Sequence, residues 1–285
     1  MKKTKIDWAD STWNPVTGCL HGCKYCYAHD IALRFGATYS EWNTEAGHEY
    51  DVYEGTGEIH ELDMPCKREW KNGKVTNAPY PFCFDPTFHK YRLDELRHWK
   101  KPRNIFVCSM ADLFGNWVPE KWIQEVFRAC EAAPQHRYIF LTKNPARLMK
   151  MYSARRFNKL KEKYPDGDIP EEIRGITPMP GHDNWWFGST VTNKNMGFAQ
   201  GSILDHNFIS IEPLQENLNV GLGSFGGVKW IIIGAETGNR KGKIIPKREW
   251  VENICEAAAI TGAKVFMKES LREIMGDDFR QEFPW

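Results

Sequence analysis

Three cysteines lie within eight residues of one another near the start of the chain, at Cys19, Cys23 and Cys26. Thiolates bind zinc and iron-sulfur clusters, and a closed structural zinc site takes four ligands. Three ligands on one short loop therefore favour a centre with an open position, such as a [4Fe-4S] cluster whose fourth iron binds a small molecule. Gly18 and Gly22 suit a loop that wraps closely around such a centre.

The main alternative for this loop is a zinc site. A distant fourth ligand could complete it, or His21, which lies between the first two cysteines, could do so. Structural zinc sites usually bring their ligands as two separated pairs, a pattern that is missing here. We therefore favour the iron-sulfur interpretation and expect His21 to be a loop residue beside the ligands.

The elements that must position this loop are indicated by short apolar runs that alternate with helical or loop segments, as in parallel βα units. Eight runs are candidate strands, at 12–14, 81–84, 104–107, 138–141, 185–188, 208–211, 230–233 and 265–267. Helices are predicted over 28–35, 119–132, 145–164 and 246–260, whereas 191–206 and 213–228 are expected to be mostly loop. The expected fold is α/β, a full or partial (βα) TIM-like barrel that forms a single domain over residues 1–285.

One segment, residues 36–80, stands outside the repeat. Between Gly36 and Pro65 there are eight acidic residues and no lysine or arginine. We expect a loop-rich acidic insertion, and a solvated surface loop is the favoured interpretation. The alternative is a lid or a surface for a partner, because long loops are often functional.

The composition of the whole chain sets only broad limits. Hydrophobic residues make up 41% of the 285 residues and the net charge is +1, which is ordinary for a globular protein and indicates no partner. Five of the eight cysteines are scattered singly, as expected for free thiols in a reducing compartment. Because there is neither an apolar leader nor a run of 18 apolar residues, we expect a cytoplasmic protein with no membrane partner.

Polar residues follow nearly every predicted strand. In βα barrels the active site forms at the C-terminal ends of the strands, so these residues are candidates for the site. The candidates are Asp85, Ser109, Asp112, Thr142, Lys143, Ser189, Thr190, Glu212, Glu236, Thr237, Lys268 and Glu269. Any one of them could be a helix cap or a loop residue, but their recurrence indicates a common mouth.

The spacing Cys-x3-Cys-x2-Cys, with Tyr25 just before the last cysteine, resembles the cluster loop of radical S-adenosylmethionine (SAM) enzymes. This resemblance implies a [4Fe-4S] cluster on Cys19, Cys23 and Cys26 whose free iron binds SAM. It also implies reductive cleavage of SAM to a 5′-deoxyadenosyl radical, a reductant such as flavodoxin or ferredoxin, and the barrel fold.

Four further segments narrow the resemblance to the phage Gp37/Gp68 family, the three-Cys-motif proteins. They read SMADLF at 109–114, LTKNP at 141–145, SIEPL at 210–214 and IGAETG at 233–238. The similarity covers nearly the whole chain and includes proteins encoded beside a dedicated partner protein. The chain departs from the family at Gly-Ala-Glu-Thr-Gly, where Gly-Gly-Glu-Ser-Gly is expected, and the Gly-Gly-Glu tripeptide that many radical SAM enzymes use for the SAM amine is not evident.

Charge and hydrogen-bonding capacity suggest contacts for SAM. The SAM carboxylate needs a cation such as Lys143, and the ribose diol needs a carboxylate or hydroxyl partner. The proposed cofactor-binding residues are Tyr25, Asp112, Thr142, Lys143, Ser189 and Glu212. Tyr25 would flank the adenine with its backbone.

Four residues are candidates for contact with the substrate. Glu236 and Lys268 follow late strands, where the resemblance places substrate as often as cofactor, although a buried pair between them could equally brace the fold. Cys83 and Cys108 would donate a hydrogen atom to a substrate radical, as in the spore photoproduct lyase relatives. Plain core packing is the favoured interpretation of both thiols.

Two basic runs point to the class of substrate. Residues 143–163 carry eight lysines and arginines against the single acid Glu162, and five more basic residues lie within 240–248. Basic residues around the active-site end of the strands would attract an anionic ligand, so a nucleic-acid-derived substrate is predicted, with solvated helix surface as the alternative.

The sequence leaves two functions open. One is a radical SAM enzyme, and the other is a cluster-bearing binding or sensing subunit that acts through a partner without SAM turnover.

Overall fold

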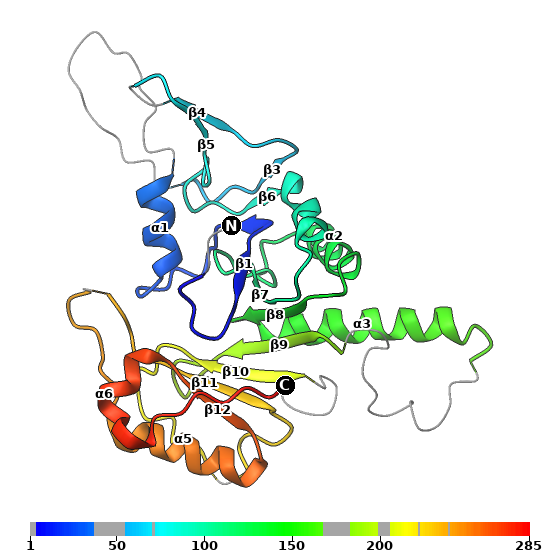
Figure 1. Ribbon diagram of the computed structural model, residues 1–285. Helices are drawn as coiled ribbons and strands as arrows, with labels where there is room; N and C mark the ends of the chain where they lie inside the picture. Colours follow the sequence, from blue (N-terminus) through cyan, green and yellow to red (C-terminus); the bar gives the residue numbers. More distant parts are fainter. Residues whose placement is uncertain are drawn as a thin grey trace. The chain divides into compact units, whose positions relative to one another are not determined.

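The computed structural model describes residues 4–36, 55–69, 72–167, 183–198, 206–221, 223–238 and 240–285 (Figure 1). The chain divides into two compact units. Residues 11–136 form one, here called the cysteine unit, and residues 1–10 together with 137–285 form the other, the sheet unit. The prediction of a single domain stays a prediction.

The cysteine unit combines a parallel strand pair, a small mixed sheet, a hairpin and two α-helices. Strand β1 (Ser11–Trp13) pairs in parallel with β7 (Asn104–Val107). The small sheet has the order β2-β6-β3, with β2 at Val16–Thr17, β6 at Thr87–His89 and β3 at His60–Leu62. The remaining elements are the hairpin β4 (Lys67–Glu69) and β5 (Val75–Asn77), helices α1 (Tyr27–Phe35) and α2 (Glu120–Glu131), and the 3-10 helix η1 (Lys90–His98).

The sheet unit contains five parallel strands in the order β8-β9-β10-β11-β12. Their bounds are β8 Arg137–Thr142, β9 Trp185–Thr190, β10 Asn207–Ile211, β11 Trp230–Ile233 and β12 Lys264–Met267. The helices within the described residues are α3 (Pro145–Lys163), α5 (Arg248–Thr261) and α6 (Arg272–Met275), with 3-10 turns η2 (Glu269–Leu271) and η3 (Gly276–Asp278).

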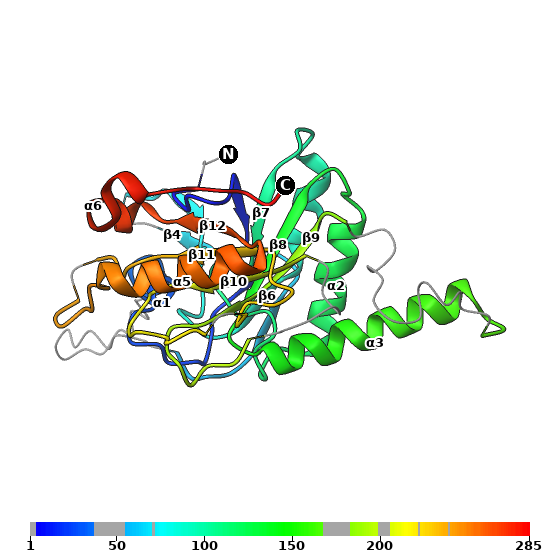
Figure 2. The same ribbon diagram turned by 90° about the horizontal axis from the view of Figure 1, so that it is seen from below.

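The two faces of this five-stranded sheet carry different cores. On one face, alternate residues such as Ile209, Ile231 and Val265 pack with Val251 and Ile254 of α5, which lies across the strands in Figure 2. The intervening strand residues face an aromatic cluster on the other side, because successive side chains of a strand point to opposite faces. Its members are Trp8, Trp186, Phe208, Trp230, Phe266, Phe283 and Trp285.

The C-terminal segment completes the edge of the sheet beside β12. Met267 donates its N–H to the carbonyl of Arg280 at 2.9 Å, and Glu282 donates to the carbonyl of Val265 at 3.0 Å. The indole of Trp230 donates to the carbonyl of Glu282 at 2.9 Å. The last residues therefore run antiparallel to β12 and cover the aromatic cluster.

The predicted (βα) TIM-like barrel is wrong. Seven of the eight predicted strands form in the described residues, two in the cysteine unit and five in the sheet unit, and the five make an open parallel sheet. The described parts of 191–206 and 213–228 contain no helix, so the helical crossovers of a βα repeat are missing there. The fold is a mixed α/β arrangement with few helices.

The missing strand is the predicted run at 81–84, which forms a turn. Cys83 has a left-handed φ of 52°, and the N–H of Asp85 bonds to the carbonyl of Phe82 at 3.0 Å. A strand cannot contain such a residue, because its backbone must stay in the extended region. Cys83 and Phe84 of this run are buried, but the backbone turns.

The predicted insertion at 36–80 is partly outside the described residues, which omit 37–54 and 70–71. Its described part is more ordered than a loop, because it supplies β3, β4 and β5. Strand β3 pairs in parallel with β6, with His60 opposite Thr87. Whether this segment is a lid or a partner surface stays a prediction.

We expect His89 to make the stability of the cysteine unit depend on pH. His89 is buried at the end of β6, where Nε2 bonds to Thr17 Oγ1 at 2.9 Å and Nδ1 to Tyr91 Oη at 3.1 Å. Burial, assisted by the charge of Arg92, lowers the pKa of His89 to about 3. The unfolded chain instead takes up this proton near pH 6.5.

The free energy of unfolding should therefore be constant above pH 6.5 and fall between pH 6.5 and 3, with a slope of up to ~1.4 kcal/mol per pH unit from this residue. Urea unfolding at pH 7, 5.5 and 4.5 measures this slope. His89→Gln keeps a polar side chain that does not titrate, so it should flatten the slope. An equal slope in both proteins would assign the pH dependence to other groups.

Candidate functional site

The three cysteines lie on the loop between β2 and α1, and the backbone of two other segments holds the start of this loop. Gly18 donates its N–H to the carbonyl of Met110 at 2.9 Å, and Cys19 donates to the carbonyl of Phe84 at 3.1 Å. Gly18 has a φ of 83°, and a Cβ there would overlap the carbonyl oxygen of Asp85. Only glycine fits this position, as the sequence suggested.

The three thiols share one electrostatic environment. Cys26 caps the N-terminus of α1, where its Sγ accepts the N–H of His29 at 3.4 Å. Burial, together with negative charge on Asp112, Cys26 and Cys23, raises the pKa of the Cys19 thiol to about 12. Cys19 is therefore protonated at neutral pH, and a metal that binds it must displace this proton.

The three cysteine side chains of the loop are not arranged to bind one metal ion in this conformation. In the part of the chain that the structure describes, no three His, Cys, Asp or Glu side chains are gathered closely enough to hold a metal ion. The number and chemistry of the donors still fit a three-thiolate iron-sulfur centre. Cluster binding would thus require the loop to draw the three thiols together.

His21 and Asp112 form a pair beside the cysteines. His21 Nε2 lies 2.7 Å from Asp112 Oδ2, and the imidazole meets the ring of Trp117 edge-on at 4.8 Å. Asp112 is buried, and its other oxygen accepts the N–H of Phe114 at 3.0 Å. Asp112 therefore orients the imidazole, as outer carboxylates orient histidines around metal sites. The predicted contact of Asp112 with the SAM ribose stays a prediction.

The other candidates in the cysteine unit are Tyr25, Cys83 and Cys108. Tyr25 is half-buried on the cysteine loop, one residue before Cys26. Cys83 and Cys108 are buried, both in the left-handed region, and Cys108 donates its N–H to the carbonyl of Trp13 at 2.8 Å. Burial raises the pKa of both thiols, that of Cys108 to about 12. A hydrogen-atom donor and a thiol that only packs in the core are both protonated, so the raised pKa does not distinguish these two roles. The role of Cys83 and Cys108 stays a prediction.

In the sheet unit, Glu212 and Lys268 form an ion pair across the end of strand β11. They follow β10 and β12 in matching register, and Gly234 follows β11 between them. Lys268 Nζ lies 2.9 Å from Glu212 Oε1, and Ser210 donates its hydroxyl to Glu212 Oε2 at 2.8 Å. A Cβ on Gly234 would lie 3.0 Å from Lys268 Cδ and 3.1 Å from Glu212 Oε1. Glycine thus leaves the space in which the two side chains meet.

Lys268 is held in its charged form, because its pKa is raised. The carboxylate of Glu212 is the main reason that its pKa lies above the usual lysine value, and Asp7 contributes to the same shift. Asp7 itself accepts the N–H of Glu269 at 3.1 Å. This contact of Asp7 with Glu269 joins the N-terminal segment to the carboxyl end of β12.

Glu236 has a different partner from the one expected. Arg240 Nε and Nη2 donate to its two carboxylate oxygens at 2.5 and 2.7 Å, and this contact holds the pKa of Glu236 below its usual value. The predicted alternative, a bracing pair between Glu236 and Lys268, is therefore wrong. Each residue has its own ion pair.

Thr142, Lys143 and Ser189 lie at the carboxyl ends of β8 and β9. Thr142 and Ser189 are opposite each other in the register and are both buried. Thr142 Oγ1 accepts the N–H of Asn144 at 2.8 Å, and Asn144 Oδ1 accepts the N–H of Arg147 at 3.3 Å. Thr142 and Asn144 thus help to begin helix α3, while Lys143 is half-buried between them.

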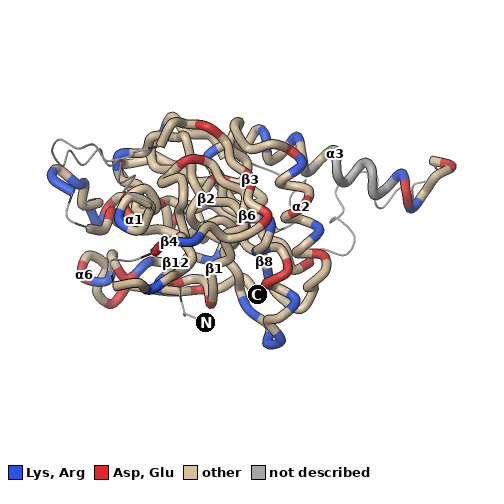
Figure 3. Tube along the Cα trace, turned by 90° about the horizontal axis from the view of Figure 1, so that it is seen from above, with Lys and Arg blue, Asp and Glu red and all other residues tan. Residues whose placement is uncertain are grey.

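The second basic run is largely neutralised within the sheet unit. Arg240 pairs with Glu236, and Lys247 Nζ lies 3.6 Å from Glu249. Arg248 pairs with Glu252 at 2.7 Å and with Asp278, and Figure 3 shows basic and acidic residues side by side around α6. This run is therefore a weak attractor for an anionic ligand.

The parallel βα segments and the cysteine loop define an α/β protein with a thiol-rich candidate site. A family model described as a protein of unknown function (DUF5131) matches residues 3–272, so the chain belongs to this family. No curated protein and no solved structure matches the chain. No helix in the described part of the chain is long and apolar enough to cross a membrane.

Proposed function

We propose that this chain is a radical SAM enzyme that holds a [4Fe-4S] cluster on Cys19, Cys23 and Cys26. The observation that carries the proposal is the placement of three thiols on one loop whose last member begins a helix. The helix dipole and the N–H groups of its first turn stabilise negative charge, and a thiolate-bound cluster is anionic. When bound, the cluster would supply the electron that cleaves SAM reductively to a 5′-deoxyadenosyl radical.

Each of the two units offers polar side chains for this chemistry. The Asp112 carboxylate holds the imidazole of His21 on the same loop as the three ligands. In the sheet unit, Lys268 offers a cation and Glu212 a carboxylate at strand ends, which suit the carboxylate and the ammonium or ribose groups of SAM. Lys143 is a second candidate for the SAM carboxylate.

The substrate and the partners belong to the proposal as well. A substrate radical formed by hydrogen abstraction would be quenched by a protonated thiol, for which Cys83 and Cys108 are candidates. The excess of basic residues in segment 143–163 is the reason to propose an anionic, nucleic-acid-derived substrate. A flavodoxin- or ferredoxin-type protein would supply electrons.

Anaerobic reconstitution tests this function. We expect about four irons and four sulfides per chain, a broad charge-transfer absorbance, and slow formation of 5′-deoxyadenosine when dithionite and SAM are added. Stoichiometric zinc without iron uptake would contradict the proposal. A cluster without any 5′-deoxyadenosine would instead support a binding or sensing subunit that acts through a dedicated partner protein.

A further inference from the structure

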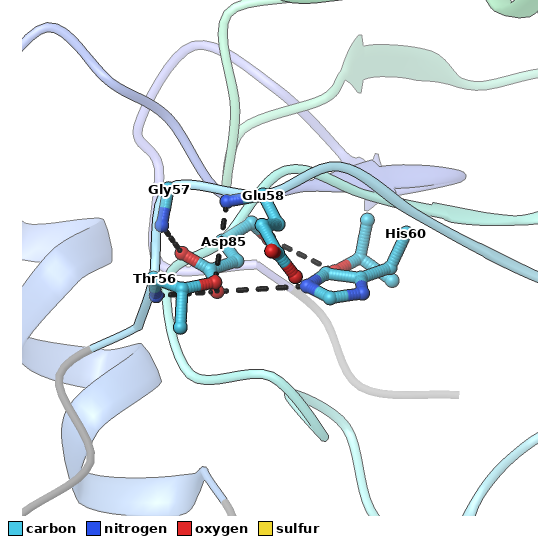
Figure 4. Close-up of polar contacts among 6 residues, drawn as sticks. Thr56, Gly57, Glu58, His60 and Asp85 are labelled. Atoms are coloured by element: carbon cyan, nitrogen blue, oxygen red, sulfur yellow. Dashed lines mark hydrogen bonds and ion pairs between the residues drawn. The ribbon is translucent and has the colours of Figure 1, made fainter.

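A buried carboxylate, Asp85, lies beneath the cysteine loop and is held by a short segment from a different part of the chain. Its side chain is 3% exposed. The backbone N–H groups of Thr56 and Gly57 converge on its two oxygens at 2.8 and 2.7 Å, and the Thr56 hydroxyl lies at 3.3 Å (Figure 4). Such converging N–H groups form a concave site for an anion.

His60 adds an imidazole and ring stacking to the same contact. Its Nε2 lies 3.5 Å from Asp85 Oδ2, and its ring stacks on Phe82 with centroids 3.8 Å apart and planes inclined by 12°. Its backbone N–H bonds to the carbonyl of Pro86 at 2.9 Å, where β3 begins its pairing with β6. Residues 55–60, which we call the clasp, therefore hold the turn 82–86 from one side.

The cysteine loop rests on the other side of the same turn. Gly18 packs against the carbonyl of Asp85 so closely that no side chain fits, and Cys19 donates its N–H to the carbonyl of Phe84 at 3.1 Å. Asp85 thus connects the two contacts. Its carboxylate is fixed by the clasp, and its backbone packs against Gly18, the residue before Cys19.

We propose that Asp85 is a positioning residue for the cysteine loop and that the clasp holds it in place. An ionised carboxylate accepts on both oxygens and so satisfies both N–H groups of the clasp, whereas an asparagine amide would turn a donor toward one of them. The loss of that contact frees the turn 82–86, and with it the support of Gly18 and Cys19. The effect on a cluster rests on the proposed function, but the effect on the loop does not.

The reactivity of Cys19 in the metal-free protein tests the loop directly. Iodoacetamide labelling, quantified for each cysteine by peptide mass spectrometry, should be slow at Cys19 in the wild type, because its side chain is half-buried and its backbone is held by the turn 82–86. In Asp85→Asn the labelling rate should rise about tenfold or more, the factor expected when a hydrogen bond to a buried charge is lost. Cys130, which is fully buried in α2, should stay unreactive and thereby show that the unit remains folded.

Gly55→Ala disturbs the same contact from the side of the clasp, while the Asp85 carboxylate itself is unchanged. A Cβ on Gly55 would lie 2.5 Å from Asp85 Oδ1, whereas Gly73, also at positive φ, has nothing within 4 Å. Gly73→Ala is thus the matched control for backbone strain, and only Gly55→Ala should expose Cys19. In a protein that already carries Asp85→Ala, Gly55→Ala should raise the labelling rate of Cys19 no more than Gly73→Ala does.

The outcomes separate this inference from the proposed function. Unchanged Cys19 labelling in folded Asp85→Asn and Gly55→Ala proteins would overturn the positioning role, whatever the wild type binds. Increased labelling in both variants, together with a wild type that takes up no iron, would keep the positioning role and reject the cluster. Where a cluster forms, both variants should also shift its EPR g-values and lower the iron per chain, and Gly73→Ala should do neither.

Discussion

Replacing Cys26 by alanine should abolish cluster formation, so that iron falls from about four per chain to background in anaerobic reconstitution. Cys19→Ala and Cys23→Ala should do the same. A [4Fe-4S] cluster with three protein ligands has no spare thiolate in the loop, and Cys26 also caps α1 through its sulfur. Iron, sulfide and absorbance measurements on each variant check this result.

Cys66→Ala and Cys255→Ala are the matched controls, because both thiols are half-buried and lie outside the cysteine loop. They should retain the full iron content. A loss of iron in these controls equal to that in the loop variants would mean that the metal is bound nonspecifically. Full iron in any loop variant would remove that cysteine from the ligand set.

Lys268→Met should lower the free energy of unfolding by about 2 kcal/mol, because it leaves the Glu212 carboxylate without its cation at a largely buried strand end. The two side chains are 26% and 18% exposed, so the loss is smaller than for a fully buried pair. Glu212→Gln should be milder, since the amide oxygen still accepts from Ser210. Urea unfolding of the single and double variants gives the coupling, expected at about 1 kcal/mol.

Lys264→Met is the control for this cycle. Lys264 lies on the same strand, β12, but its Nζ is 4.0 Å from Glu282 and both side chains are exposed. Such a pair contributes little, so this variant should stay within about 0.5 kcal/mol of the wild type. A Lys268→Met protein as stable as the control would show that solvent already neutralises Glu212.

Most elements of the fold could be predicted because their signals are local. The apolar runs at 104–107 and 230–233 coincide with β7 and β11, and a proline lies at or just before the start of α2, α3 and α5. The closure of the strands into a barrel has no such local signal. It depended on counting runs, and the run at 81–84 turns at Cys83, whose left-handed φ is not apparent from its residue type.

The partners within the candidate site were beyond sequence reasoning for a related reason. His21 and Asp112 are 91 residues apart, and Asp85 meets Gly57 across 28 residues. Neither pair has a periodicity that links its members. Glu212 and Lys268 were both predicted as strand-end residues, but their contact depends on strand register and on the missing side chain of Gly234.

The pairing of the C-terminal segment with β12 has a consequence for the solubility of the sheet unit. An uncovered edge strand presents a row of unpaired N–H and C=O groups to any other extended chain. Here the contacts of Met267 with Arg280 and of Val265 with Glu282 fill part of that row, and Trp285 lies over the aromatic residues behind it. The last residues therefore protect this edge against intermolecular β-pairing, and a chain shortened before Arg280 would expose a template for aggregation.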